Sequence, residues 1–168
     1  LGDQGGSCSV DANGNVYLSG STSSSNNIAF GGYQNTYTGG GPFLVKFNSA
    51  GVRQWATYYY NGWGFQDGRS CAVDGSGNVY LSGEYWNGFD GDRVFLVKFN
   101  SAGVFQWEKS SEGVSTSGQE TRGGFCAVDN ANNVYISGQT KALSNIASGG
   151  HQNTHGGGWD VFLIKYNS

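Results

Sequence analysis

Six acidic residues lie in the loop-rich segments of this 168-residue chain, where they could supply the carboxylates that glycoside hydrolysis needs. That reaction takes two carboxyl groups roughly 5 to 9.5 Å apart. The spacing of the six in the sequence does not single out such a pair, and no nucleophile is accompanied by a base. We therefore predict no catalytic residue and no enzyme. The six are Asp67, Glu84, Asp90, Asp92, Glu120 and Asp160.

The only two histidines, His151 and His155, lie four positions apart in one loop. Two histidines at this spacing bind a metal ion together when a helix carries them and a third ligand completes the site. The first repeat of the chain, described below, has Tyr33 and Tyr37 at the equivalent positions, so the loop keeps a shape rather than a coordination geometry. We predict neither a metal site nor a cofactor.

The segment Asp11-Ala-Asn13-Gly-Asn15 has oxygen-bearing side chains at alternate positions, as in a calcium-binding loop. Calcium takes 6 to 8 oxygen ligands, usually including several carboxylates, and this loop has one. Weaker versions begin at Asp74 and Asp129. The alternative interpretation, which we favour, is an Asx turn, in which the aspartate side chain accepts hydrogen bonds from the backbone two residues on.

Five aromatic residues form a candidate ligand-binding set, because they lie in loops whose lengths differ between the repeats. Aromatic rings among Asn, Gly and Asp suit sugar rings or a protein partner. The alternative is that these rings cap the ends of the strands and seal neighbouring sheets against each other. The five are Tyr59, Trp63, Tyr85, Trp86 and Trp159.

Two sequence blocks recur along the chain and must position these residues. The first block, Cys-x-Val-Asp-x-x-x-Asn-Val-Tyr-x-Ser-Gly, occupies residues 8–20, 71–83 and 126–138. The second, Phe-Leu-x-Lys-x-Asn-Ser, begins at Phe43, Phe95 and Phe162, and its first two copies continue through Ala-Gly-Val-x-Gln-Trp. The cysteines are 63 and 55 residues apart, so the repeat is about 50 to 60 residues long.

Each repeat predicts four short strands, because β-branched and aromatic runs alternate with Gly, Asn, Asp and Ser. No helical periodicity is present. The first strand is small or apolar on both sides, which indicates sheets stacked on sheets. We predict an all-β chain of three β-propeller blades at residues 1–63, 64–115 and 116–168, the third without its fourth strand. A solenoid of stacked hairpins is the alternative.

Three blades are too few for a closed ring, because propellers typically have 4 to 8. The start at Leu1 and the absence of methionine indicate a segment of a longer chain; a ring of several copies and an open arc remain alternatives. The strand that ends near Lys165 should have an unpaired edge, which favours pairing with another chain. Other propeller blades, in an extended chain or in further copies, are thus the predicted partners.

Two residue types recur at equivalent strand positions. Cysteines Cys8, Cys71 and Cys126 are expected to be buried free thiols that act as small hydrophobes. The lysines are expected to lay their stems on apolar surface with their heads in water; a ring of positive charge facing an anionic ligand is the alternative. These lysines are Lys46, Lys98 and Lys165.

The motif Val-Asp-x-x-Gly-Asn-Val-Tyr-Leu-Ser-Gly, followed by Gly-Gly-x-Gln-Asn-Thr and Phe-Leu-Val-Lys-Phe-Asn-Ser-Ala-Gly, resembles the bacterial SBBP-type β-propeller repeat. The resemblance covers nearly the whole chain. It implies a secreted or cell-surface bacterial protein, and it offers no family-wide catalytic residues. The second repeat lacks the Gly-Gly-x-Gln-Asn-Thr element found at residues 31–36 and 149–154.

Composition narrows the function further. Lys+Arg number 9 against Asp+Glu 12, which gives a net charge of −3 and argues against nucleic-acid binding. No apolar run reaches the roughly 18 residues of a membrane span. We expect a non-enzymatic extracellular repeat scaffold or binding module that assembles with further blades. The alternative is a lectin-like, glycan-binding propeller that uses the aromatic loop face.

Overall fold

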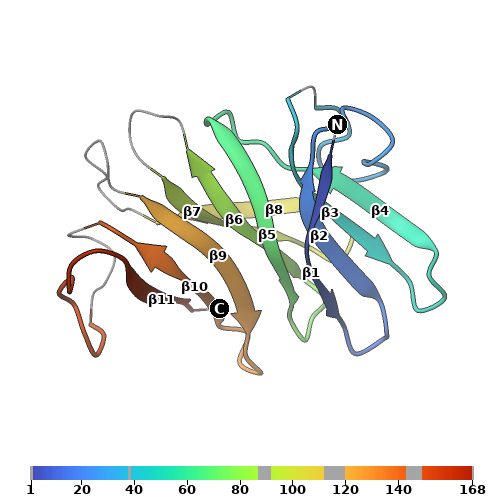
Figure 1. Cartoon of the computed structure of the whole chain (residues 1–168). Helices are drawn as coiled ribbons and strands as arrows, with labels where there is room; N and C mark the ends of the chain where they lie inside the picture. Colours follow the sequence, from blue (N-terminus) through green and yellow to red (C-terminus); the bar gives the residue numbers. More distant parts are fainter. Residues whose placement is uncertain (1, 38, 87–91, 112–119, 143–148, 168) are drawn as a thin grey trace.

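The computed structural model of the chain describes residues 2–37, 39–86, 92–111, 120–142 and 149–167. These residues form eleven strands in three antiparallel sheets and contain no helix (Figure 1). The prediction of an all-β chain without helices is confirmed for this part of the chain. It also contains no helix that could cross a membrane.

Each sheet is a meander in which strands consecutive in the sequence pair with each other. Sheet 1 contains β1 (Asp3–Val10), β2 (Val16–Thr22), β3 (Gly41–Phe47) and β4 (Arg53–Tyr58). Sheet 2 contains β5 (Phe65–Val73), β6 (Val79–Trp86), β7 (Arg93–Phe99) and β8 (Phe105–Ser110). Sheet 3 contains β9 (Thr121–Val128), β10 (Val134–Thr140) and β11 (Asp160–Tyr166). The predicted count of four, four and three strands is thus confirmed for the described residues.

The turn after the first strand of each sheet is an Asx turn. Asp11 Oδ1 accepts hydrogen bonds from the backbone N–H groups of Asn13 and Asn15, both at 2.9 Å. Asp74 and Asp129 accept the equivalent bonds in sheets 2 and 3. The Asx-turn interpretation of these loops is therefore confirmed. Among the described residues, no three His, Cys, Asp or Glu side chains are grouped so that they could hold a metal ion.

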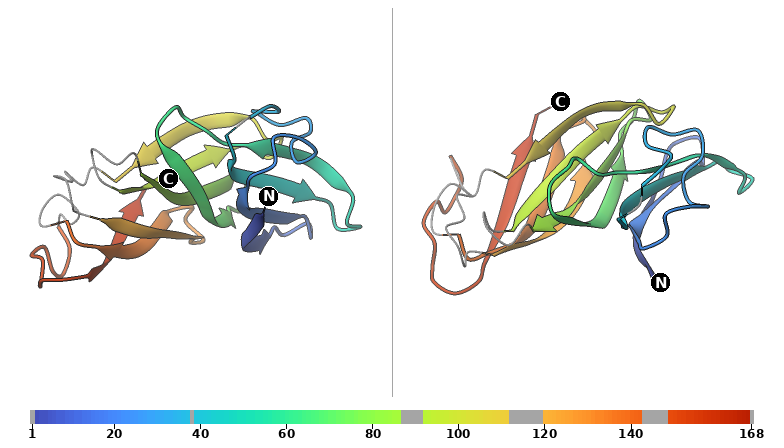
Figure 2. Two further views of the ribbon diagram at one scale, coloured as in Figure 1. Left: turned by 45° about the horizontal axis from the view of Figure 1, so that its top comes forward. Right: turned by 90° about the horizontal axis from the view of Figure 1, so that it is seen from above.

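The sheets pack face to face in the order of the sequence, with β5 between β1 and β9 (Figure 2). Tyr17, Leu44 and Trp55 of sheet 1 form one core with the facing strands of sheet 2. Tyr80 and Leu96, on the opposite face of sheet 2, form a second core with sheet 3. Sheet 2 is thus buried on both faces, whereas sheets 1 and 3 each have one outer face.

A glycine in the second strand of each sheet lets an aromatic ring of the third strand lie across the backbone. A Cβ at Gly83 would come within 2.8 Å of the Phe95 ring, and a Cβ at Gly138 would come equally close to the ring of Phe162. Gly20 and Phe43 repeat the arrangement at 2.9 Å. The glycine that ends the first sequence block therefore has a packing role inside each sheet.

The three cysteines are free thiols, but the prediction that all are buried is wrong for one of them. Cys71 is buried between sheets 1 and 2, and Cys126 is partly buried between sheets 2 and 3. Cys8 is exposed, because it lies on the outer face of sheet 1, where no further sheet of the described residues packs against β1.

Candidate functional site

The outer face of sheet 3, here called the C face, is an unusually apolar surface. Val161 is 86% exposed and Leu163 is 69% exposed, although both lie in β11 and are paired with β10. Phe125 on β9 is also exposed, and Tyr135 on β10 lies on the same face. Three strands thus present large apolar groups to solvent, which single scattered surface residues do not do.

The residues equivalent to those of the C face are buried in sheets 1 and 2. Leu96 of sheet 2 occupies the position of Leu163 and is 0% exposed, and Val94, equivalent to Val161, is 1% exposed. Leu44 of sheet 1 is likewise fully buried. At the leucine and valine positions of β11, the C face therefore repeats the surface of sheet 2 that receives the next sheet.

Hydrogen bonds between neighbouring sheets also recur at equivalent positions. The Gly68 N–H of sheet 2 donates to Ser21 Oγ of sheet 1 at 2.7 Å. The Gly123 N–H of sheet 3 donates to Glu84 Oε2 of sheet 2 at 2.9 Å. The equivalent side chain in sheet 3 is Gln139, which is exposed. The C face thus has a hydrogen-bond acceptor at the position where sheets 1 and 2 each accept a hydrogen bond from the next sheet.

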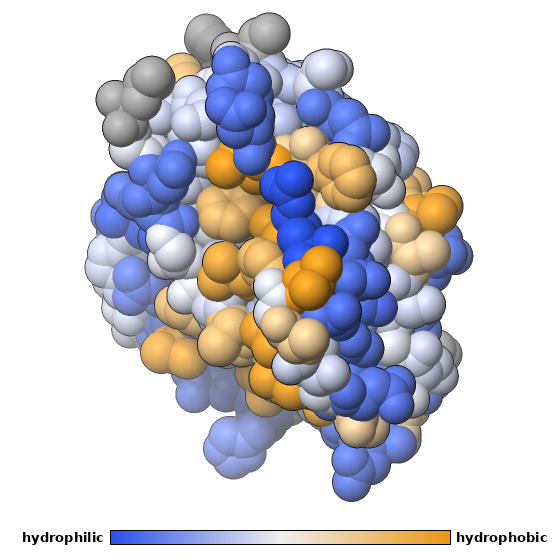
Figure 3. Space-filling model, turned by 90° about the vertical axis from the view of Figure 1, so that its right-hand side faces the viewer, coloured by the Kyte–Doolittle hydropathy of each residue, from blue (hydrophilic) through white to orange (hydrophobic). Residues whose placement is uncertain are grey.

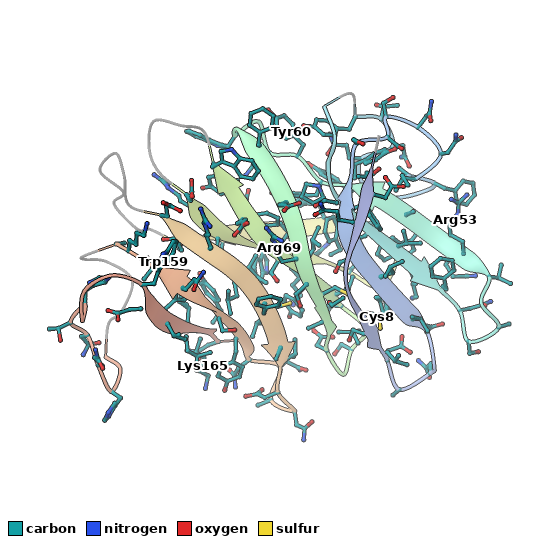
Figure 4. The ribbon with its side chains drawn as sticks, viewed as in Figure 1. Cys8, Arg53, Tyr60, Arg69, Trp159 and Lys165 are labelled. Carbon is teal, nitrogen blue, oxygen red and sulfur yellow. The ribbon has the colours of Figure 1, made fainter. Side chains whose placement is uncertain are left out.

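Of the three repeated lysines, Lys46 bonds to the neighbouring sheet, which the sequence interpretation did not foresee. Their ammonium groups lie over tyrosine rings of the same sheet, at 5.3, 5.2 and 5.6 Å from the ring centroids. Lys46 Nζ also donates to the Ser101 carbonyl oxygen of sheet 2 at 3.0 Å, beside the Trp55 Nε1–H, which donates to the same oxygen at 3.1 Å. Lys165, at the sheet 3 end of the stack, is exposed (Figure 4).

The opposite end of the stack, the outer face of sheet 1, is here called the N face. Cys8, Val10 and Leu18 are exposed there, while their equivalents in sheet 2 pack against sheet 1. Ile28, from the segment between β2 and β3, covers the β3 half of this face, and Phe30 from the same segment is exposed. A band of apolar side chains runs down this side of the molecule (Figure 3).

A cavity of about 370 Å³ opens between sheets 2 and 3. Tyr85 and Trp86 supply its aromatic wall, and the remaining lining side chains carry two positive and two negative formal charges. The charged residues are Arg69, Glu84, Asp92 and Arg122. Small-ligand sites are usually lined mainly by apolar and aromatic groups, whereas this cavity has more charged than aromatic residues in its lining.

Ion pairs hold most of the charged groups around this cavity. Arg69 pairs with Asp67 at 2.9 Å and with Glu84. Burial lowers the pKa of its guanidinium, but the hydrogen bond and charge of Glu84, together with the charge of Asp67, outweigh burial and raise it. Glu120 pairs with Arg122 and with Lys141. Arg69 lies in the middle of the stack, on β5 (Figure 4).

Asp92 lines the same cavity. Burial raises the pKa of its carboxyl group, and the neighbouring negative charge of Glu120 raises it further.

The five candidate aromatic residues do not form one surface. Tyr85 and Trp86 line the cavity, and Trp159 lies close by, with the Arg122 guanidinium 5.3 Å from its ring centroid. Tyr59 packs on the Phe95 ring in the core between sheets 1 and 2 and is almost fully buried. Trp63 is exposed and does not line the cavity.

The cavity residues Arg69 and Arg122 were missed by the sequence interpretation, which concentrated on aromatic and acidic side chains. The signal that could have found Arg69 is its place directly before the Ser-Cys pair, where the first repeat has Gly6. Of the six carboxylates considered for catalysis, Asp90 lies outside the described residues. Asp160 lies near His155, with 3.6 Å between Oδ2 and Nε2. His151 is exposed.

No family model matches the chain, and no curated protein is significantly similar to it in sequence. The repeats, the stacking and the two outer faces therefore carry the functional interpretation.

Proposed function

We propose that the chain is a non-enzymatic repeat scaffold whose three sheets are β-propeller blades and whose C face docks a further sheet of the same kind. The observation that carries the proposal is the contrast between Leu163 and Val161, which are exposed, and their equivalents Leu96 and Val94, which the next sheet buries. A secreted or cell-surface bacterial setting belongs to the proposal through the resemblance of the repeat alone.

The energy available at the C face supports docking. Burying a valine or leucine side chain stabilises a protein by roughly 1.5 to 3 kcal/mol. Val161 and Leu163 lie together with Phe125 on one face, so a docking sheet would bury several such groups at once. The polar groups at the edges of this face, Gln139 and Lys165, repeat positions that bond to the next sheet elsewhere, so docking would leave few of them without partners.

The proposal is tested by adding the sheet that it calls for. Asn167 and Ser168 repeat Asn48 and Ser49, so a copy of residues 50–111 appended after Ser168 continues the repeat in register. We expect the extended chain to unfold in one transition at a temperature several degrees above that of the parent chain, because the C face becomes part of a core. Leu163→Asp in the extended chain should remove this gain, because it buries a charge.

An extended chain in which the appended residues melt separately, with the parent transition unchanged, would contradict docking. Val104→Asp is the matched control, because Val104 is exposed in the turn between β7 and β8. It should keep the gain. The non-enzymatic part of the proposal would be contradicted if the parent chain hydrolysed a glycan and Asp92→Asn abolished that hydrolysis.

The second candidate function is glycan binding in the cavity between sheets 2 and 3. It is favoured by the partly exposed Trp86 ring beside guanidinium and carboxylate groups, which can stack on a sugar ring and bond to its hydroxyl groups. A glycan array tests it. Trp86→Ala should abolish binding, and Trp63→Ala should not, because Trp63 is exposed away from the cavity. Binding that survives Trp86→Ala would exclude this site.

A further inference from the structure

We propose that the occupant of the C face is the N face of a second copy of this chain, so that copies associate head to tail. The proposal rests on the proposed docking function and names its partner. The two faces lie at opposite ends of the stack, at sheet 1 and sheet 3 (Figure 1), so one copy offers both halves of an interface that it does not form with itself.

The stacking inside the chain supplies the template for the apolar contact. Where sheet 2 packs on sheet 1, Leu81, Cys71 and their neighbours lie against Tyr17 and Leu44. Where sheet 3 packs on sheet 2, Ile136 and Cys126 lie against Tyr80 and Leu96. The next step of the same series places Leu18 and Cys8 of a second copy against Tyr135 and Leu163. Leu18 and Cys8 are exposed on the N face, as this step requires.

The polar contacts continue in the same way. Inside the chain, Ser21 and Glu84 accept hydrogen bonds from the N–H groups of Gly68 and Gly123 in the next sheet. The residue equivalent to the two acceptors in sheet 3 is Gln139, and the residue equivalent to the two donors in sheet 1 is Gly5. Gln139 is therefore expected to accept a hydrogen bond from the Gly5 N–H of a second copy. The bond from Lys46 to the Ser101 carbonyl likewise predicts a bond from Lys165 to the Ser49 carbonyl of the second copy, in the equivalent turn. Apolar and polar positions thus require the same register.

One position departs from the series. Ser7 and Ser70 face the next sheet from the inner strands, and the equivalent residue of sheet 3 is Phe125. A phenylalanine adds apolar area at a place where the other sheets have a hydroxyl group. Phe125→Ser, which restores the residue of the other repeats, should therefore retain association in the same register.

The interface is heterologous, because it joins two different surfaces of one chain. Such interfaces make rings when the rotation between copies closes and open chains when it does not. Two copies contain six sheets, a number within the 4 to 8 blades typical of closed propellers.

A cross-link tests the register directly. The Sγ atom of Cys71 lies 3.8 Å from Ser7 Oγ, and that of Cys126 lies 3.8 Å from Ser70 Oγ. The same geometry brings Cys8 of a second copy next to position 125. In Phe125→Cys, oxidation with diamide should form a disulfide between position 125 and Cys8 of the neighbour, with two-electron reduction of the diamide. Dimers and longer species should then appear on non-reducing gels.

The matched control is Phe125→Cys combined with Cys8→Ser, which should give no product of this linkage. The cross-link is measured at protein concentrations where sedimentation shows association. If no disulfide forms there between position 125 and Cys8, the head-to-tail register is wrong.

Complementary variants test the direction of association by sedimentation velocity. Leu163→Asp blocks the C face and Leu18→Asp blocks the N face, and each alone should weaken self-association at least about a hundredfold, because an unpaired aspartate would be buried. An equimolar mixture should form a heterodimer that grows no further, since each variant keeps one working face. Val104→Asp should associate like the native chain.

This inference would be overturned if Leu18→Asp still self-associated like the native chain. It would also be overturned if the mixture of the two variants stayed monomeric. A native chain that is monomeric at high micromolar concentration would overturn it as well. If the extended chain described above nevertheless gains stability, the docking function stands and only the identity of the partner is wrong. Circular dichroism shows whether each variant keeps its strands.

Discussion

Sheets 2 and 3 are built from the same two sequence blocks, yet one is buried on both faces and the other on one. Leu96 and Leu163 occupy equivalent positions in β7 and β11, but Leu96 is 0% exposed and Leu163 is 69% exposed. The three strands of sheet 3 are fully paired with one another, since β10 pairs with both β9 and β11 over seven registered positions each, but sheet 3 has no counterpart of β8 among the described residues. Within the described part of the chain, sheet 2 has a sheet packed against each of its two faces, whereas sheet 3 has one against a single face.

This comparison separates two kinds of residue in the repeat. Some act inside their own sheet, such as Gly83 beside the Phe95 ring, and should behave alike in every repeat. Others act on the next sheet, such as Leu96, and matter only where a next sheet is present. The predictions below separate the two kinds, from the largest expected effect to the smallest.

Leu96→Ala and Leu163→Ala should differ most. Truncating Leu96 leaves a cavity between sheets 2 and 3 and should lower the free energy of unfolding by about 2 to 5 kcal/mol. Truncating Leu163 in the monomer should lower it by less than about 1 kcal/mol, because the side chain is exposed there. Urea unfolding at a concentration where the protein is monomeric measures both. Equal losses would mean that the C face is already covered in the monomer.

The thiols should show the same contrast chemically. Burial raises the pKa of Cys71, and it raises the pKa of Cys126 to about 11, so at pH 8 only about one Cys126 in a thousand is the thiolate. Iodoacetamide should therefore label the exposed Cys8 at least about a hundredfold faster than Cys126 in the folded monomer. Mass spectrometry of labelled peptides gives the three rates. Labelling of all three cysteines at one rate would contradict the stacking of the sheets.

Gly83→Ala and Gly138→Ala should have similar effects. In each case the new methyl group would meet a phenylalanine ring at 2.8 Å and a carbonyl oxygen of the neighbouring strand. Overpacking of this kind should destabilise the chain by about 1 to 3 kcal/mol. Because the contact lies inside one sheet, the variants of sheets 2 and 3 should agree within error in thermal unfolding. If Gly83→Ala lowered the unfolding temperature and Gly138→Ala did not, the phenylalanine ring would pack differently in sheet 3.

Acid sensitivity should be the smallest effect. The Asn133 amide and nearby N–H groups lower the pKa of Asp129 from 3.8 to about 2. A lowered folded-state pKa contributes stability that is fully present above the unfolded-state value and is lost as the pH falls from 3.8 through about 2. Urea titrations between pH 5 and 2 should therefore show the native chain losing more stability than Asp129→Asn, which has no charge to lose. Parallel pH profiles would contradict this assignment.

Much of the fold could be predicted from the sequence, because the repeat makes each sheet a local unit. The strand runs, the Asx turns and the order of the sheets follow from residues close together in the chain. The second loop of the first repeat was harder, since Phe30 bonds to Ala56 in β4 and Tyr33 stacks on Phe105 of sheet 2 at 5.0 Å. Such contacts between distant residues have no periodic signal.

The candidate site was predictable only in part for the same reason. Trp86 and Tyr85 were predicted from their type and position to bind a ligand, which stays a prediction, and both line the cavity. Tyr59 has the same residue type in a similar place, yet it is a core residue. Arg69 and Arg122 join the site because sheets 2 and 3 pack together there, which depends on tertiary structure rather than on local sequence.

The most direct test of the docking face is side-chain footprinting of the parent chain and of the chain extended by residues 50–111, both at nanomolar concentration. Carbene labelling of Leu163 and Val161 should be strong in the parent chain and should fall in the extended chain to the level that Leu96 and Val94 show in the parent chain. Labelling of Leu163 that stays the same in both chains, while the appended strands are folded, would show that the C face receives no further sheet.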